Sequence, residues 1–255
     1  LSRLDNRLPY IACQGNHDLG YIAAEYRYSM MPNYIYPERN SAFAKTLVST
    51  GTNYEGIHTM ENSAYEFHDE AWGDLLIISF EFAPRDEALD WARQLIESER
   101  FVNHKVIILT HSFLATNGDR IVEEGYKLTP RNWAQAVWEK LIYPSKNIKM
   151  VLCGHTGNPP KIRKGEDVDY HMTTSYRVDK AADGHEVVQM MFNSQNGDGS
   201  WNGNGGDCWL RILEFKPDGK TIGVRTFSPL FALSRHTQHL AWRTAEYDQF
   251  LITIK

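Results

Sequence analysis

Three consecutive side chains that can bind metal ions or transfer protons, Asn16, His17 and Asp18, stand between glycines in the segment CQGNHDLG. An Asn carbonyl and an imidazole nitrogen are suitable ligands for zinc, iron or manganese. The glycine before them, Gly15, lets the backbone turn sharply and approach a metal ion or a phosphate closely. The segment therefore predicts that Asn16 binds a metal ion, that His17 faces the substrate, and that Asp18 orients a neighbour or holds the turn.

Two further histidines share this context, because each one ends a continuous apolar run. His111 ends the run KVIILTH, and His155 ends the run IKMVLCGH. Such runs are typical of strands buried on both faces of a sheet, and ligands of open α/β sheets gather beyond the carboxyl ends of the strands. We therefore expect both histidines to meet Asn16 at one edge of a sheet, with His17 beside it. The other seven histidines lack this context and are expected to be structural or on the surface.

Helices should alternate with these strands. Residues 84–97 open with a proline and acidic residues, and their apolar positions follow the i, i+3, i+4, i+7 spacing of an amphipathic helix. Residues 129–142 repeat that spacing, with Thr129 as the N-cap and Pro130 as the first helical residue. Residues 1–14 are expected to be the end of a helix that leads directly into a strand, so we expect the chain to be a fragment without its N-terminal part.

The last third of the chain predicts antiparallel strands at 185–195, 208–215 and 221–228. The turn sequence KPDGK between the last two predicts a hairpin. Strand–helix alternation followed by antiparallel strands fits one layered α/β domain. The glycine-rich segment 197–207 lacks the carboxylate spacing of a calcium loop and is expected to be a loop at the edge of the sheet.

Composition narrows the classes of function. The chain has 255 residues and a net charge of −5, which gives no overall positive field for nucleic acids or anionic membranes. No apolar stretch approaches the roughly 18 residues that a membrane span needs. The three cysteines form no C-x-x-C pair, which indicates neither a disulfide framework nor a zinc knuckle. A serine hydrolase is disfavoured because no Gly-x-Ser-x-Gly motif occurs.

The chain resembles the calcineurin-like metallophosphoesterases at three motifs. These are GNHD at 15–18, THS with His111, and CGHTG at 153–157, and they occur in the order of the family. The resemblance covers roughly residues 8 to 160, and the β-rich tail is similar to the closing strands of bacterial members. It implies an α/β fold, a layered α/β/β/α sandwich of the metallo-dependent phosphatase type with an antiparallel C-terminal part. It also implies one domain over residues 1–255 that lacks the first strands and motifs.

The resemblance further implies a phosphoric ester hydrolase that cleaves a phosphate mono- or diester. In the family a di-metal centre of manganese, iron or zinc holds a bridging hydroxide, which is the nucleophile. Residues that match Asn16, His111 and His155 bind the second metal ion, and the one that matches His17 is a general acid or stabilises the transition state. His17 and Asp18 are thus the predicted catalytic residues. The expected partner is a phosphate ester, without nucleic acid or membrane, and an exported or periplasmic location is favoured.

The chain departs from the family pattern in two places. The upstream motifs Asp-x-His and Gly-Asp-x-x-Asp are not found in residues 1–14, so we expect this fragment to hold the second-site metal only, or none, and to be nearly inactive. Gly157 replaces a family histidine, for which His171 is a weak candidate substitute. Two alternatives stay open. One is a degenerate, non-catalytic member of the family that only binds its ligand, an alternative that Gly157 favours. The other is a nuclease of the same superfamily, which the negative net charge of the chain disfavours.

Overall fold

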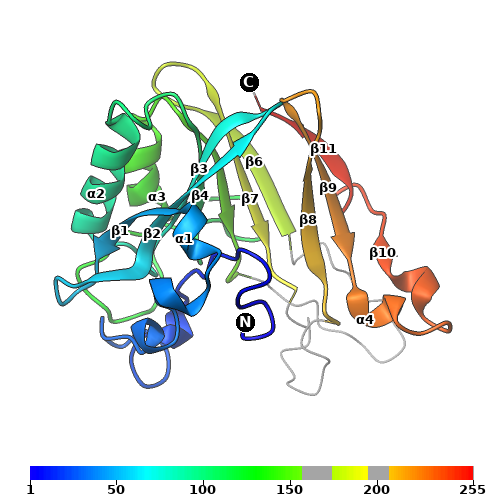
Figure 1. Cartoon of the computed structure of the whole chain (residues 1–255), viewed down its shortest axis with the longest axis horizontal. Helices are drawn as coiled ribbons and strands as arrows, with labels where there is room; N and C mark the ends of the chain where they lie inside the picture. The colour runs from blue at the N-terminus through cyan, green and yellow to red at the C-terminus, as the bar shows by residue number, and fades with distance from the viewer. Residues whose placement is uncertain (157–173, 195–206, 255) are drawn as a thin grey trace.

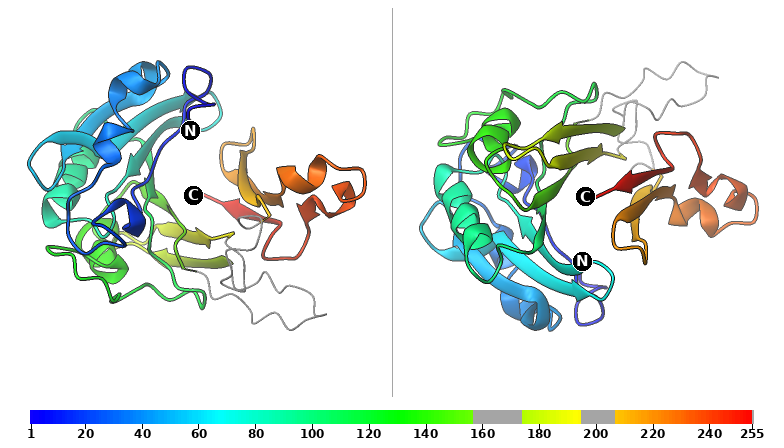
Figure 2. Two further views of the ribbon diagram at one scale, coloured as in Figure 1. Left: turned by 90° about the horizontal axis from the view of Figure 1, so that it is seen from below. Right: turned by 90° about the horizontal axis from the view of Figure 1, so that it is seen from above.

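Two β-sheets packed face to face form the framework of the protein (Figure 1). The computed structural model describes residues 1–156, 174–194 and 207–254. Helices α2 and α3 lie against the outer face of the larger sheet, and the smaller sheet faces its inner side (Figure 1). The second sheet lies opposite the β5 and β7 part of the larger one, as the views along the sandwich show (Figure 2). This mixed α/β sandwich confirms the predicted fold class.

Among the described residues, seven strands form the larger sheet in the order β1-β2-β3-β4-β5-β7-β6. Strands β3, β4, β5 and β7 run parallel, and the other pairings are antiparallel. The strands are β1 (Leu47–Thr52), β2 (His58–Asp69), β3 (Gly73–Ser79), β4 (Lys105–Leu109), β5 (Ile148–Cys153), β6 (Thr174–Lys180) and β7 (Glu186–Phe192). The predicted strands that precede His111 and His155 are confirmed as β4 and β5.

The smaller sheet is antiparallel, and β9 is its centre within the described part of the chain. It contains β8 (Leu210–Phe215), β9 (Thr221–Phe227), β10 (Trp242–Arg243) and β11 (Phe250–Thr253). The predicted β8–β9 hairpin is confirmed, and its turn needs Gly219, which has a φ of +70°. A Cβ atom there would also lie 2.2 Å from the carbonyl oxygen of Ala71. The predicted loop at 197–207 lies outside the described residues up to residue 206.

Alternate residues of the central strands pack into two separate apolar cores. In β4, Val106 and Ile108 pack with the residues of the helix side, whereas Ile107 packs with the second sheet. Because side chains alternate across a strand, a continuous β-branched run supplies both cores at once. Ile222 and Ile252 of the smaller sheet belong to the inter-sheet core. Each such burial stabilises the fold by about 1.5–3 kcal/mol.

The first predicted helix is confirmed as α2 (Asp86–Glu97), but the second begins later than predicted. It runs as α3 (Ala134–Val137) and continues as one π-helical stretch, Trp138–Ile142. The prediction of a helix start at Pro130 was therefore wrong. The carbonyl of Pro130 accepts a hydrogen bond from Arg27 Nε at 2.9 Å, so a side chain takes the place of a helical N–H.

The N-terminal segment also differs from the prediction. Residues 1–7 form turns and not a helix, and residues 9–14 do not pair as a strand. Both flanks of β3 are occupied by β2 and β4, so the segment packs instead with the apolar cluster that contains Met60 and Tyr65 of β2, and it reaches β3 at its carboxyl end. There Ser79 Oγ donates to the carbonyl of Ala12 at 3.2 Å. A backbone without a free neighbouring strand cannot form a ladder, however apolar its sequence.

Short elements complete the described chain. They are the 3-10 turns η1 (Asn16–Asp18), η2 (Met31–Asn33), η3 (Pro37–Arg39) and η6 (Gln238–Leu240), and the one-turn helices α1 (Phe43–Thr46) and α4 (Pro229–Ala232). Within the described ranges, no helix combines the length and apolar composition needed to cross a bilayer.

Candidate metal centre

Two predicted ligands lie at the carboxyl ends of parallel neighbouring strands. His111 follows β4 and His155 follows β5, so both emerge at the same edge of the large sheet. The N–H of Gly154 donates to the His111 carbonyl at 2.9 Å and ties the two strand ends together. Asn16 reaches the same edge from η1. The structure therefore brings together the three residues that the sequence analysis selected as metal ligands.

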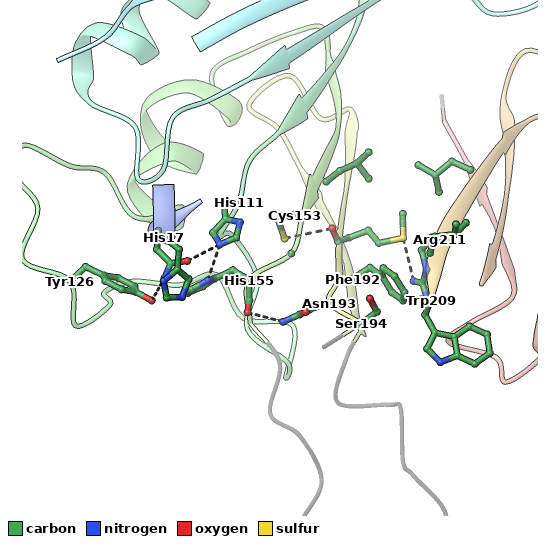
Figure 3. Close-up of a pocket in the computed structure, with 16 residues that line it drawn as sticks. His17, His111, Tyr126, Cys153, His155, Phe192, Asn193, Ser194, Trp209 and Arg211 are labelled. Carbon is green, nitrogen blue, oxygen red and sulfur yellow. Dashed lines mark hydrogen bonds between the residues drawn. The ribbon is translucent and has the colours of Figure 1, made fainter. Parts of the chain in front are cut away.

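The donor atoms of this group converge on His111 Nε2 (Figure 3). Asn16 Oδ1 lies 2.9 Å from that nitrogen, and His155 Nδ1 lies 3.1 Å from it. At this distance at most one of the two ring nitrogens carries a proton. When both rings are neutral, the other nitrogen presents a lone pair to the group. Burial, reinforced by the charge of nearby His155, lowers the pKa of His111 to about 4, which keeps His111 neutral at pH 7.

The donor set fits a zinc, iron or manganese ion. Two imidazole nitrogens and an amide oxygen are ligand types that these ions accept, and they leave coordination positions open. In the described part of the chain, no group of three or more His, Cys, Asp and Glu side chains is placed to hold a metal ion. The amide of Asn16 therefore completes a three-donor group in which only two members are titratable.

Two side chains that the sequence analysis did not single out contact the ligands from behind. Glu124 Oε2 lies 3.2 Å from His155 Nε2, on the side of the ring away from His111. Tyr126 Oη accepts a hydrogen bond from Asn16 Nδ2 at 3.0 Å. Neither residue ends an apolar run or belongs to a recognisable motif, so no sequence signal could have found them.

His17 and Asp18 occupy different surroundings. His17 is exposed beside the three-donor group, and its Nδ1 lies 2.8 Å from the carbonyl oxygen of Ile22, which leaves Nε2 to face other partners. Asp18 turns back on its own loop, where its Oδ2 accepts the N–H of Gly15 at 2.7 Å. The structure thus places His17 at the group and gives Asp18 the contact of a residue that holds the turn.

A cavity of about 650 Å³ opens from the three-donor group toward the second sheet. Its volume is that of a small-molecule site. The far wall is formed by β8 and the residue before it, Trp209, together with Phe192 of β7 (Figure 3). Arg211 of β8 contributes a positive charge to this wall, with its guanidinium 4.6 Å from the centre of the Phe192 ring and 3.3 Å from Asp248 Oδ1.

Two sequence predictions cannot be placed at this edge. Gly157, where the family pattern has a histidine, and His171, its predicted substitute, lie outside the described residues.

Comparison with known proteins places these residues in a family context. The model of the calcineurin-like phosphoesterases matches residues 1–159, a range that contains Asn16, His111 and His155. The chain is 24% identical over 227 residues to the uncharacterized protein YvnB of Bacillus subtilis (strain 168). That alignment covers 87% of this chain and 14% of the relative, so the chain spans about a seventh of the curated relative that it matches.

Proposed function

The chain belongs to the calcineurin-like phosphoesterase family, and we propose that Asn16, His111 and His155 hold a divalent metal ion in it. Membership implies metal-dependent hydrolysis of phosphoric esters. The observation that supports this role is the convergence of Asn16 Oδ1 and His155 Nδ1 on His111 Nε2, at 2.9 and 3.1 Å. We propose zinc, iron or manganese as the ion, because these metals accept imidazole together with oxygen donors.

The chain's own groups have separate tasks in this proposal. A bound divalent ion supplies Lewis acidity toward a phosphoryl oxygen. His17 holds Nδ1 against the Ile22 carbonyl, so its Nε2 is the atom that gives a proton to the leaving oxygen of the ester. Asp18 keeps the turn closed through the Gly15 N–H, and it acts on the reaction only by placing Asn16 and His17.

We propose that the ester group lies in the cavity between the three-donor group and the second sheet. Its volume of about 650 Å³ suits a small phosphate ester. The positive charge of Arg211 on the far wall favours an anionic substrate. The whole protein is proposed to use two metal ions and a bridging hydroxide. The described donors account for one ion, so this chain alone is proposed to bind at most one and to turn over little or no substrate.

Metal content tests the assignment directly. We expect up to one zinc, iron or manganese ion per chain by elemental analysis of the purified protein, and loss of this ion in the double variant Asn16→Ala/His155→Ala. The double variant Asn33→Ala/His239→Ala is a matched control, because it removes the same residue types at exposed positions away from the site. Equal metal content in all three proteins would contradict the ligand assignment.

Activity is measured separately with p-nitrophenyl phosphate and bis(p-nitrophenyl) phosphate in the presence of added Mn²⁺. Rates close to those of the Asn16→Ala/His155→Ala variant are expected for this chain. Robust turnover that disappears in the variant would keep the ligand assignment and overturn the proposal that the chain holds an incomplete centre.

A further inference from the structure

We propose that Glu124 and Tyr126 are positioning residues that set the donor atoms of the metal centre before the ion binds. This inference rests on the proposed metal-binding role of Asn16 and His155. Both residues belong to the connection between β4 and α3, whereas their partners come from η1 and from the end of β5. One short stretch of this connection therefore contacts two ligands that lie far apart in the sequence.

Glu124 acts on the protonation pattern of His155. Its Oε2 lies 3.2 Å from His155 Nε2, while Nδ1 of the same ring lies 3.1 Å from His111 Nε2. A neutral imidazole carries one proton, and a carboxylate beside Nε2 favours the form with the proton on that nitrogen. Nδ1 then presents its lone pair to the three-donor group. Carboxylates that face the far nitrogen of a ligand histidine orient the ring and raise its basicity as a ligand.

The carboxylate of Glu124 is itself held in place. Its other oxygen, Oε1, accepts a hydrogen bond from Ser112 Oγ. The side chain is only 12% exposed and that of His155 18% exposed, so water screens their contact weakly. Ser112 directly follows the ligand His111 in the sequence. Glu124 therefore connects the strand end that carries His111 to the ring of His155.

Tyr126 acts on Asn16 in a comparable way. Its hydroxyl accepts the Asn16 Nδ2 hydrogen bond at 3.0 Å, which leaves Asn16 Oδ1 directed at His111 Nε2. The tyrosine ring packs edge-on against Phe82, with 5.3 Å between ring centres. Because this packing fixes the ring, the hydroxyl is a stationary acceptor, and it opposes rotation of the amide that would turn nitrogen toward the metal.

Metal affinity of the full chain tests both roles. Titration with Zn²⁺ alone, followed by calorimetry, is compared for the wild type, Glu124→Ala, Glu124→Gln, Tyr126→Phe and Glu123→Ala. We expect about 10- to 100-fold weaker binding for Glu124→Ala, as for other contacts behind a ligand histidine. Glu124→Gln should recover part of the loss, because the amide oxygen still places a partial negative charge beside His155 Nε2. Tyr126→Phe should weaken binding about 3- to 10-fold.

Glu123→Ala is the matched control. Its side chain is 77% exposed, and its carboxylate lies 3.9 Å from Arg131. It should bind Zn²⁺ as the wild type does. Thermal unfolding of each metal-free variant verifies that it is folded before titration. Wild-type affinity in a folded Glu124→Ala protein would overturn the role of Glu124, and wild-type affinity in Tyr126→Phe would overturn that of Tyr126.

A readout without metal separates this inference from the proposed function. In the metal-free wild type, ¹⁵N chemical shifts should place the His155 proton on Nε2, and Glu124→Ala should populate the Nδ1-protonated form. The side-chain amide signals of Asn16 should shift in Tyr126→Phe and stay unchanged in Glu123→Ala. If the wild type binds no Zn²⁺ but shows these changes, the metal proposal fails and the positioning contacts stand. Unchanged signals in both variants would overturn the positioning roles whatever the metal result.

Discussion

The backbone of Gly15 lies directly against the imidazole ring of His111. A Cβ atom at residue 15 would lie 3.0 Å from His111 Cε1 and 3.2 Å from each ring nitrogen. The φ of Gly15 is −104°, which any residue can adopt, so the glycine is required here for close approach and not for its backbone freedom. A methyl group at residue 15 would therefore require the His111 ring to move by a few tenths of an ångström.

Replacement of Gly15 by alanine should displace the His111 ring and separate it from Asn16. We expect about 10-fold weaker Zn²⁺ binding and a loss of about 1–3 kcal/mol in the free energy of unfolding, as for other insertions into packed regions. Calorimetric titration and urea unfolding measure the two effects. Gly125→Ala is the control, because a Cβ atom there meets nothing within 4 Å. Equal Zn²⁺ affinity in both variants would show that the ring tolerates the extra methyl group.

Much of the site could be predicted because its signals are local. An apolar run that ends in histidine identifies both a strand and its carboxyl end, and parallel pairing of β4 and β5 then brings His111 and His155 to one edge. The hairpin at Gly219 was predictable for a similar reason, since the turn chemistry is contained in a few adjacent residues.

The remaining features depend on contacts between segments that are distant in sequence. The run before Asn16 is as apolar as a strand, yet it packs with residues of β2, a strand whose two edges already pair with β1 and β3. The helix α3 starts beyond Pro130, whose carbonyl accepts a hydrogen bond from Arg27, 103 residues away in the sequence. Glu124 lies in a connection without periodicity, and its importance follows only from the position of the His155 ring. The periodicity of apolar residues indicates which residues share a face of one helix or strand, but it does not indicate contacts between distant segments.

Asp18 should act on stability more than on proton transfer. Its Oδ2 is the acceptor for the Gly15 N–H at 2.7 Å, and Gly15 is buried. Asp18→Ala leaves that donor unpaired and should lower the free energy of unfolding by about 1–3 kcal/mol. Asp18→Asn keeps an acceptor oxygen and should lose less, which urea unfolding can measure. In contrast, a proton-transferring Asp18 without a role in the turn would predict Asp18→Ala and Asp18→Asn variants with the stability of the wild type.

The free energy of unfolding should depend on pH through Glu61, which is buried beneath the loop that carries Gly15 and Asp18. Its carboxylate accepts a hydrogen bond from Gln14 Nε2 at 2.6 Å, but burial raises the pKa of Glu61 above its ordinary 4.5. The folded protein therefore binds this proton more tightly than the unfolded chain. The contribution of Glu61 to the free energy of unfolding is complete below about pH 4.5. It is lost as the pH rises through the pKa that Glu61 has in the folded protein.

The variant Glu61→Gln cannot ionise and can still accept the bond from Gln14. Its unfolding free energy minus that of the wild type should be smallest near pH 4.5 and should grow as the pH rises toward 7.5. Urea unfolding at several pH values in this range measures the difference. A difference that stays constant with pH would show that the carboxyl group ionises as readily in the folded protein as in the unfolded chain.

Arg27 should contribute strongly to stability, because it joins two loops that surround the site. Its guanidinium donates to the carbonyl oxygens of Phe82, Ala83 and Pro130, at 2.7, 2.5 and 2.9 Å, and the residue is only 4% exposed. Arg27→Ala would leave these buried acceptors without their donor. We expect a loss of about 3–5 kcal/mol in the free energy of unfolding, as when one partner of a buried charged network is removed.

The matched control for Arg27 is Arg93→Ala. Arg93 also donates to a backbone carbonyl, that of Lys140 at 2.6 Å, and it pairs with Asp90 at the surface. Because water replaces the lost bonds there, its removal should cost at most about 1 kcal/mol. Arg27→Lys keeps the charge but cannot present a fork of donors to three carbonyls, so it should lie between wild type and Arg27→Ala. Comparable losses for Arg27→Ala and Arg93→Ala would mean that the two loops hold their positions without the guanidinium.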